Sequence, residues 1–298
     1  MINNNFKSGF IAIIGRPNVG KSTLLNKILG KKIAIISPKP QTTRNRILGV
    51  KSLPQAQLVF LDTPGIHRVN SGLSKRMVIT ALTTLQEVNL VLHLVEPEEY
   101  KWGKEDFILE KLSSVNVPIF LLINKIDTII KENLLPLIKQ CDSLGIYQEI
   151  LPISALDGEG IDLLIDNIIR AIPCGPRYFP EDMISDQMER FLVAEIIREK
   201  IFKLTEQEIP YSTAVLIEEF KEREEKELIS IRALINVERD SQKGIIIGKQ
   251  GKMIRKIGEK ARLELEKLLG TRIYLDLFVK VQKDWSKDPR ALREFGYQ

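Results

Sequence analysis

The sequence has few of the side chains that bind transition metals or form disulfide frameworks. Its 298 residues include two cysteines, Cys141 and Cys174, and two histidines, with no Cys-x-x-Cys pair and no Cys/His cluster. Two isolated cysteines predict free thiols in a reducing compartment. No apolar run approaches the roughly 20 residues of a membrane-spanning helix, and residues 1–7 contain no signal-peptide hydrophobic region. We therefore expect a cytoplasmic globular protein.

A strong excess of either charge sign is also missing. The net charge is +5 and the sequence pI is about 9.0, which mildly favours an anionic partner. The length predicts about two domains. A composition that is 44% hydrophobic and 28% charged is ordinary for domains with a sizeable core.

The most informative stretch is the pattern Gly-x-x-x-x-Gly-Lys-Ser at 15–22, between the apolar run 10–14 and a helical pattern at 22–29. A strand, a glycine loop and a helix are the context in which this pattern binds nucleotide phosphates. Glycines let successive backbone N–H groups point at phosphate, and the helix N-terminus adds its positive dipole end. The Lys21 ammonium is expected to reach the β- and γ-phosphates, and the Ser22 hydroxyl to bind Mg²⁺. The predicted phosphate-loop residues are Gly15, Arg16, Pro17, Asn18, Val19, Gly20, Lys21 and Ser22.

Two later segments are expected to complete the phosphate and magnesium site. Residues 37–46 are expected to form a polar loop in which Thr42 or Thr43 binds Mg²⁺. This loop is expected to become ordered only when a triphosphate is bound. Asp62 ends the apolar strand 58–62 and is expected to hold Mg²⁺ through water, while the Gly65 amide bonds the γ-phosphate. Residues 66–73 predict a second mobile switch, in which His67 is a solvated loop residue. The predicted catalytic residues are Lys21, Thr43, Asp62 and Gly65, the metal ligands are Ser22, Thr43 and Asp62, and Thr63, Pro64 and Ile66 join the nucleotide-binding set.

A guanine-binding pattern follows the strand 118–123. The Asp127 carboxylate can accept from both N1–H and the N2 amine of guanine, a donor pair that adenine lacks, so Asp127 selects GTP. Lys125 lays the alkyl stem of its side chain along the base, and Asn124 ties this loop to the phosphate loop. Ile126, between Lys125 and Asp127 in the sequence, joins the nucleotide-binding set. The Ser154-Ala155 turn, after the strand 150–153, can offer a backbone N–H to guanine O6. Because each motif ends a strand, the sequence predicts a GTP site at one edge of a parallel sheet.

Two side chains near this site have no catalytic role in our interpretation. His93, within the predicted strand 90–95, is expected to be a hydrogen-bonded core residue. Ile66 occupies the position at which Ras-like GTPases carry the glutamine that orients the attacking water. Isoleucine cannot hydrogen-bond water, so we expect slow intrinsic hydrolysis, assisted by another group or by K⁺ bound through Asn18.

A change in element order marks a second domain. Residues 173–180 hold three prolines and a glycine, which predicts a domain boundary. We expect a first domain at 5–175, a linker at 176–186 and a second domain at 187–298. The predicted order in the second domain is a helix at 186–204, neighbouring antiparallel strands at 211–220 and 228–238, a helix after residue 251 and a strand at 270–281.

The second domain contains a basic Gly-Lys-Gln-Gly loop at 248–251, which is the Gly-x-x-Gly loop of a KH domain. Such a loop clamps the backbone of about four nucleotides of single-stranded RNA, and the cations around it add salt-dependent attraction. A helix-capping glycine turn without function is the alternative. For Trp285, stacking on bases and packing as an anchor both remain open. The predicted RNA-binding residues are Lys243, Gly248, Lys249, Gln250, Gly251, Lys252 and Arg255.

The combined motifs resemble the Era family of bacterial GTPases over nearly the whole chain. The resemblance rests on residues 15–22, 40–44, 62–66, 124–127 and 248–251, and on a single C-terminal KH domain. It implies an α/β P-loop GTPase domain with a mostly parallel, doubly wound sheet, followed by an α+β KH domain of type II.

The same resemblance implies a function. It indicates a Mg²⁺-dependent GTPase that converts GTP to GDP, binds the 3′ end of 16S rRNA and acts in biogenesis of the 30S subunit. It also implies a cytoplasmic protein with a peripheral inner-membrane fraction, and we expect a monomer that does not bind DNA. One alternative is a membrane-associated signalling GTPase whose KH-like domain docks a protein. Another is a constitutive RNA-binding protein with a relic nucleotide site, against which the intact Lys21, Ser22, Asp62 and Asp127 argue.

Overall fold

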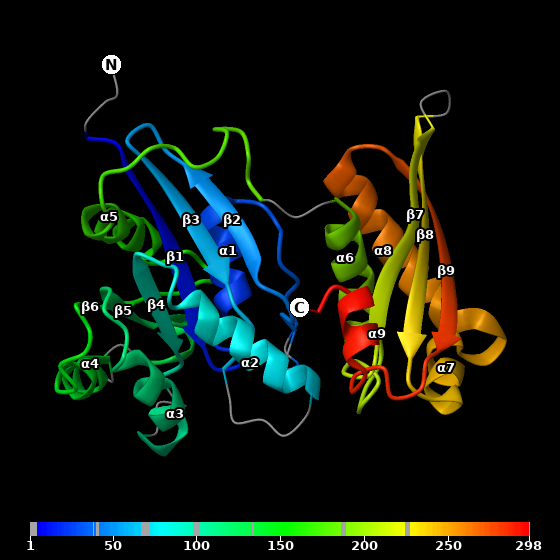
Figure 1. Cartoon of the computed structure of the whole chain (residues 1–298), viewed down its shortest axis with the longest axis horizontal. Helices are drawn as coiled ribbons and strands as arrows, with labels where there is room; N and C mark the ends of the chain where they lie inside the picture. Colours follow the sequence, from blue (N-terminus) through cyan, green and yellow to red (C-terminus); the bar gives the residue numbers. More distant parts are fainter. Residues whose placement is uncertain are drawn as a thin grey trace. The chain divides into compact units, whose positions relative to one another are not determined.

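The computed structural model describes residues 5–37, 39, 42–66, 72–97, 102–130, 132, 134–185, 189–223 and 227–297. The chain divides into two compact units (Figure 1). The first comprises most of residues 1–186, and the second comprises residues 187–298 with 35–39 and 71–73. Among the described residues, no helix is both long and apolar enough to cross a membrane. Neither cysteine forms a disulfide.

The first unit is built on a six-stranded sheet in the order β2-β3-β1-β4-β5-β6. Only β2 runs antiparallel to its neighbour, and the other pairs are parallel. The strands are β1 (Lys7–Gly15), β2 (Ile47–Ser52), β3 (Ala56–Asp62), β4 (Leu90–Val95), β5 (Ile119–Ile123) and β6 (Glu149–Pro152). The helices are α1 (Lys21–Leu29), α2 (Gly72–Thr84), α3 (Trp102–Leu112), α4 (Leu134–Asp142) and α5 (Ile161–Ala171), with a 3-10 turn η1 (Ile126–Thr128).

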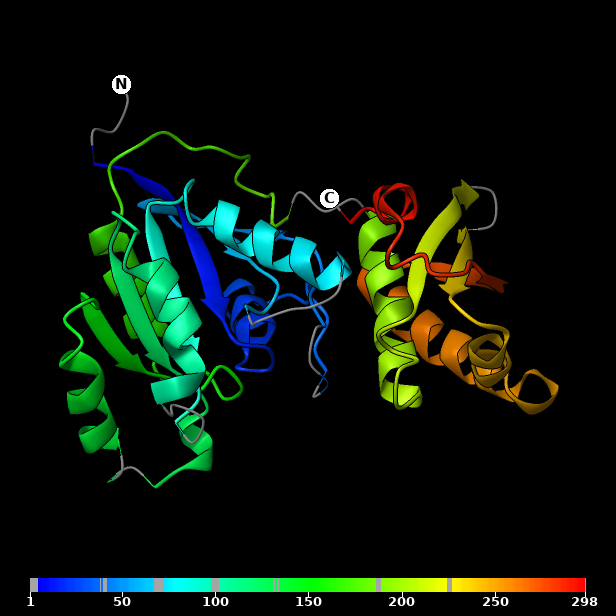
Figure 2. The ribbon, with the colours of Figure 1, turned by 60° about the horizontal axis from the view of Figure 1, so that its bottom comes forward.

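Both faces of this sheet are covered, which is why its central strands are mostly apolar. The side chains of Ala12, Ile14 and Val91 pack against α2 and α3, and those of Leu121 and Ile123 pack against α4. Helices α1 and α5 lie on the opposite face (Figure 2). The carboxyl ends of β1, β3, β4 and β5 therefore meet at one edge, where the predicted motifs begin.

Two features of the first unit differ from the simple sequence pattern. Residues 47–52 form β2, an edge strand that pairs with β3 and that the sequence pattern did not predict. Residues 176–185 of the predicted linker run along that edge: Val50 N donates to Ile184 O at 2.7 Å, and the Gln57 side chain donates to Phe179 O at 2.8 Å. Hydrogen bonds to the sheet thus anchor this proline-rich segment up to Ser185, whose hydroxyl donates to Leu48 O.

The second unit is a three-stranded sheet, β7-β8-β9, packed against helices. Strands β7 and β8 are antiparallel, as predicted, and β8 and β9 are parallel. The isoleucines of β8 alternate inward and form one core with side chains of α6 and α8. The elements are α6 (Glu189–Leu204), β7 (Ala214–Arg223), β8 (Leu228–Val237), α7 (Asp240–Ile247), η4 (Lys249–Gly251), α8 (Lys252–Leu269), β9 (Arg272–Val281) and α9 (Pro289–Glu294).

The predicted order of this unit lacked two helices. Residues 240–247 form α7 before the glycine loop, and its start is capped by the Gln242 side chain, whose Oε1 accepts from Glu238 N at 2.9 Å and from Arg239 N at 3.1 Å. In the tail, α9 begins at Pro289 after Asp288, whose side chain accepts from Arg290 N. The side chain of Trp285 is fully buried and donates to Ser212 O at 3.0 Å, so of its two open roles the structure supports the anchor.

Candidate nucleotide site and RNA-binding loop

Three predicted magnesium ligands meet at the carboxyl end of β3. The Ser22 hydroxyl, in the first turn of α1, donates to Asp62 Oδ2 at 2.7 Å. The Thr43 hydroxyl lies 2.8 Å from Ser22 Oγ and 3.5 Å from Asp62 Oδ2. The sequence left Thr42 and Thr43 open, and these contacts support Thr43. Asp62 is fully buried, and among the residues that the structure describes its Oδ1 has no hydrogen-bond partner.

This donor set fits Mg²⁺. A carboxylate and two hydroxyls are hard oxygen ligands, and Mg²⁺ is usually held by one or two carboxylates together with phosphate and water. A buried carboxylate oxygen without a partner is costly unless a cation or a donor meets it. Among the described residues, no cluster of three or more His, Cys, Asp or Glu side chains suits a metal ion.

Lys21 lies beside this cluster, directed back at the loop that precedes it. Its ammonium donates to Gly15 O at 3.1 Å and to Arg16 O at 2.8 Å. Burial lowers the pKa of Lys21 to about 8, although the charges of Asp62 and Glu105 oppose the shift. Burial likewise raises the pKa of Asp62 to about 6, against Lys21 and the hydrogen bonds from Ser22 and Thr43. Both charged groups therefore lie in surroundings that disfavour charge.

The two glycines of the phosphate loop are required by its backbone. Gly15 and Gly20 have φ of 148° and 100°. A Cβ on Gly15 would lie 2.4 Å from Leu94 O, and one on Gly20 would lie 2.3 Å from Asn124 Nδ2. Asn18, also in the loop, has a left-handed φ of 69°. These conformations turn the loop tightly over the end of β1.

The guanine-pattern residues lie together at the ends of β5 and β6. Asn124 donates to Val19 O at 2.7 Å and accepts from Ala155 N at 2.9 Å, which is the predicted tie to the phosphate loop. The exposed Asp127 accepts from Ser154 Oγ at 2.7 Å, which fixes its carboxylate.

One partner in this region had no sequence signal. Lys125, with a left-handed φ of 64°, forms an ion pair with Glu96, which the sequence analysis did not identify.

The start of the second predicted switch packs against the phosphate loop. A Cβ on Gly65 would lie 2.7 Å from Pro17 N, so only glycine allows this approach. Ile66 N donates to Gly15 O at 3.1 Å, and the Ile66 side chain is 1% exposed. Ile66 is therefore a core residue and orients no water. Residues 67–71, including His67, lie outside the described residues, as do residues 38, 40 and 41 of the first predicted switch.

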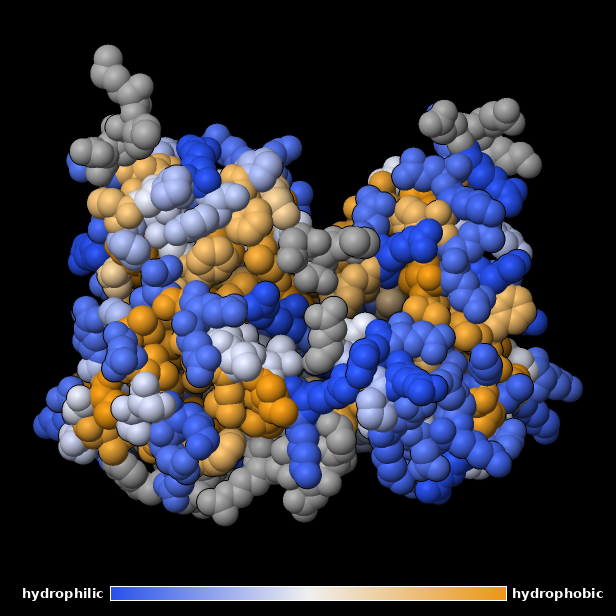
Figure 3. All heavy atoms as spheres, in the orientation of Figure 1, coloured by the Kyte–Doolittle hydropathy of each residue, from blue (hydrophilic) through white to orange (hydrophobic). Residues whose placement is uncertain are grey.

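In the second unit, the glycine loop joins α7 to α8. Gly248 has φ 71° and ψ 170°, and a Cβ there would lie 2.7 Å from Met253 Cβ. Gly251, with φ 74°, precedes α8 directly. Figure 3 shows mostly hydrophilic residues over the end of this unit where α7 lies in Figure 1. The loop thus presents main chain and cations, as an RNA backbone requires.

Two pockets lie along α8. A pocket of about 480 Å³ is lined by two predicted RNA-binding residues, Gly251 and Arg255. Its other lining residues, which the sequence analysis missed, are Ile254, Gly258, Glu259, Arg262, Leu275 and Leu277. They come from α8 and β9, so only tertiary structure brings them together.

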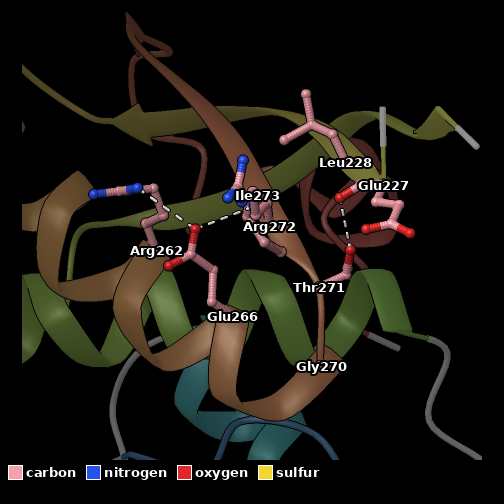
Figure 4. A pocket seen from close by; sticks show the side chains of 8 residues that line it. All are labelled: Glu227, Leu228, Arg262, Glu266, Gly270, Thr271, Arg272 and Ile273. Atoms are coloured by element: carbon pink, nitrogen blue, oxygen red, sulfur yellow. Dashed lines mark hydrogen bonds and ion pairs between the residues drawn. The ribbon is translucent and has the colours of Figure 1, made fainter. Parts of the chain in front are cut away.

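The second pocket, of about 770 Å³, lies towards the other end of α8 (Figure 4). It shares Arg262 with the first, and Glu266 accepts from Arg262 at 3.5 Å and from Ile273 N at 3.2 Å. The negative charges of Glu227 and Glu266 balance the positive charges of Arg262 and Arg272 in its lining. It therefore lacks the excess of positive charge found at the glycine loop.

Comparisons with known proteins agree with this arrangement. Residues 10–125 match the family described as 50S ribosome-binding GTPase, and residues 208–286 match the KH domain. The chain is 55% identical to the GTPase Era of Geotalea uraniireducens over the whole of both chains. The chain belongs to the Era family of GTPases. The Era protein of Syntrophus aciditrophicus is 57% identical over 98% of this chain and 95% of its own.

Solved Era structures have the same fold. A variant of Aquifex aeolicus Era bound to GDP and AlF₄⁻ matches 98% of this chain and 99% of its own, with a TM-score of 0.95 and 45% identity. Era in complex with MgGDPNP and nucleotides 1506–1542 of 16S ribosomal RNA matches equally large shares, with a TM-score of 0.94 and 45% identity. As an Era-family protein, the chain is a GTPase with a C-terminal KH domain.

Proposed function

We propose that this chain is a Mg²⁺-dependent GTP-hydrolysing switch that binds the 3′ end of 16S rRNA and acts in biogenesis of the 30S subunit. The observation that carries the nucleotide half is the meeting of the Ser22 and Thr43 hydroxyls at Asp62 Oδ2, beside the buried Oδ1, for which the described residues provide no hydrogen-bond partner. The RNA half is supported by the Gly248–Gly251 loop and by the solved Era complex with 16S rRNA.

In the proposed site, each group acts where charge is present or develops. Ser22 and Thr43 hold Mg²⁺ with their hydroxyls and Asp62 holds it through water; bound Mg²⁺ neutralises charge between the β- and γ-phosphates. The Lys21 ammonium leaves the loop carbonyls for the phosphates. The Gly65 amide donates to the γ-phosphate, and Asp127 accepts from guanine. The phosphate-loop amides and Ala155 N complete the contacts.

Hydrolysis by this site alone is proposed to be slow. The buried Ile66 side chain replaces the group that orients water in Ras-like GTPases. We propose that K⁺, held through Asn18, supplies part of the missing charge stabilisation. GTP turnover faster in KCl than in NaCl at equal ionic strength is the expected result, and an Asn18→Ala variant should lose the difference.

The KH loop is proposed to take single-stranded RNA. Gly248 and Gly251 let the main chain approach phosphates, and Lys243, Lys249, Gln250, Lys252 and Arg255 add charge and hydrogen bonds. The protein is further proposed to act as a cytoplasmic monomer that does not bind DNA and associates peripherally with the inner membrane. The alternative of a KH-like domain that docks a protein is not favoured, because the related Era structure contains RNA.

The test measures both activities on one preparation. RNA affinity is measured by fluorescence anisotropy with a 16S rRNA 3′-end fragment, and GTP turnover is measured with and without that RNA. Gly248→Asp/Gly251→Asp, which places carboxylates where phosphates should lie, is expected to abolish RNA binding and retain nucleotide binding. Lys21→Ala is expected to lose turnover. Native protein that binds no RNA would overturn the RNA half, and absence of turnover would overturn the GTPase mechanism.

A further inference from the structure

A chain of buried polar side chains leads from the interior of the first unit to the phosphate loop. His93, on β4, is fully buried, and its Nδ1 lies 3.0 Å from the Tyr147 hydroxyl. Its Nε2 lies 3.3 Å from Glu105 Oε2. The other oxygen of Glu105 lies 4.0 Å from Arg16 Nε, in the phosphate loop. The sequence analysis predicted a hydrogen-bonded core histidine, and none of the proposed steps uses Glu105.

With a neutral imidazole and an ionised Glu105, the hydrogen bonds of this chain run in one direction. If the imidazole carries its proton on Nε2, it donates to the Glu105 carboxylate and its Nδ1 accepts from the Tyr147 hydroxyl. The carboxylate then accepts from His93 and faces the Arg16 guanidinium. Glu105 is 3% exposed and lies in the first turn of α3, where the helix dipole favours an anion.

The position of this chain connects it to the loop backbone. His93 pairs in register with Ile14, the last residue before Gly15, so its ring orients Glu105 from a fixed place beside the loop. The carbonyls of Gly15 and Arg16 are the two groups that hold the Lys21 ammonium. Displacement of Arg16 would therefore move the backbone at the start of the phosphate loop, together with the carbonyl that holds Lys21 in the nucleotide-free protein.

We propose that Glu105 is a positioning residue of the GTP site: held by His93 and Tyr147, it anchors Arg16 and thereby sets the start of the phosphate loop. The inference rests on the nucleotide-binding role proposed above. Because the loop cradles phosphates that GDP and GTP share, the effect falls on binding of both nucleotides and not on the hydrolytic step.

A positioning role for Glu105 and its charge alone predict opposite changes in nucleotide affinity. Glu105 is an anion near an anion-binding loop, so its long-range charge alone would weaken nucleotide binding, and Glu105→Gln would bind more tightly. A positioning role predicts the reverse, because a phosphate loop displaced by even a fraction of an ångström loses aligned hydrogen bonds. The sign of the change in affinity therefore separates the two effects.

The test compares four variants with the native protein for GDP affinity, KM, kcat and unfolding temperature. Glu105→Gln keeps the shape of the side chain and a hydrogen bond to His93 but removes the charge facing Arg16. Arg16→Gln removes the other partner, and the double variant closes the cycle. Glu110→Gln is the matched control, because this exposed carboxylate lies on the same helix.

The proposal predicts that Glu105→Gln raises the Kd of GDP and the KM of GTP about tenfold, with kcat within about twofold. The double variant should bind GDP no more weakly than the single variant with the lower GDP affinity. Glu110→Gln should match the native protein in Kd and KM. A lower unfolding temperature with unchanged Kd and KM would show a purely structural network and overturn the proposal, as would tighter binding by Glu105→Gln. If native protein itself binds no nucleotide, the proposed GTP site fails instead.

Discussion

At the scale of the residue, the GTP site keeps two opposite charges where burial disfavours both. The pKa of Asp62 is raised to about 6 and that of Lys21 is lowered to about 8, in each case chiefly by burial. Near pH 7 both groups are charged, so the nucleotide-free protein carries an electrostatic cost. In the proposed complex, magnesium and phosphate would supply the missing counter-charges, so the cost would serve function and not stability.

Removal of the Asp62 charge should therefore stabilise the empty protein. Since the folded-state pKa lies above the ordinary carboxyl value, ionised Asp62 costs folding free energy above about pH 6. Asp62→Asn removes that cost while keeping an acceptor for Ser22. At pH 7.5 we expect the unfolding temperature of nucleotide-free protein to rise by about 2–4 °C, which corresponds to about 1 kcal/mol, and Mg²⁺-dependent GTP binding to weaken. An unfolding temperature below that of the native protein would contradict this account.

Nucleotide affinity should peak between the two pKa values. Binding requires ionised Asp62 and protonated Lys21, so affinity falls as pH drops below about 6 and as it rises above about 8. Each limb should approach about tenfold per pH unit. Titration of a fluorescent GDP analogue from pH 5 to 9 with Mg²⁺ measures the profile. Asp62→Asn should flatten the acid limb alone, and an acid limb unchanged in that variant would assign it to another group.

At the scale of the element, the sequence was most informative where function depends on the ends of strands. The motifs at Asp62, Asn124 and Ser154 each follow an apolar run, so their meeting at one sheet edge could be predicted from the parallel topology alone. The preference for Thr43 over Thr42 as the magnesium ligand could not be predicted from the sequence, because both residues carry the same hydroxyl. Only the contacts of Thr43 with Ser22 and Asp62 support it.

Other elements depended on tertiary contacts that no local pattern shows. Three consecutive isoleucines, 245–247, do not have a helical period, yet they end α7. Of the three, Ile246 is buried, and the Gln242 side chain caps the start of the helix by accepting from Arg239 N. The buried Trp285 side chain donates a hydrogen bond to the carbonyl of Ser212, which is 73 residues away in the chain. The pockets along α8 likewise combine a helix with a later strand.

The glycine loop before α8 offers a matched pair of substitutions. Gly251 and Gly270 have nearly equal backbone angles, φ 74° and ψ 12° against φ 69° and ψ 13°, at opposite ends of α8. A Cβ on either glycine meets nothing within 4 Å. Both alanine variants should lose about 1 kcal/mol of stability, but only Gly251→Ala should weaken RNA binding, by about tenfold or more, because its Cβ would stand where an RNA phosphate is proposed to approach the main chain. Equal RNA affinity of the two variants would contradict a role for this loop; anisotropy with the 3′-end fragment measures it.

At the scale of the whole molecule, one chain joins a GTPase domain to a KH domain that carries the proposed RNA-binding loop. GTP binding and RNA binding each follow from the chemistry of one unit, whereas coupling between them belongs to the complete chain. If RNA favours the GTP-bound form, linkage requires that GTP favour RNA binding by the same factor. The predicted coupling comes from the loops around Thr43 and Gly65, which order on the triphosphate and release on hydrolysis.

The most direct test of this coupling is the affinity for a 16S rRNA 3′-end fragment, measured at fixed salt with Mg²⁺ and either a non-hydrolysable GTP analogue or GDP. We predict binding at least about fivefold tighter with the GTP analogue, which corresponds to about 1 kcal/mol of coupling. Thr43→Ala should reduce the difference while leaving the affinity in GDP unchanged. Equal affinity of the native protein in the two nucleotide states would contradict the switch and leave two independent activities in one chain.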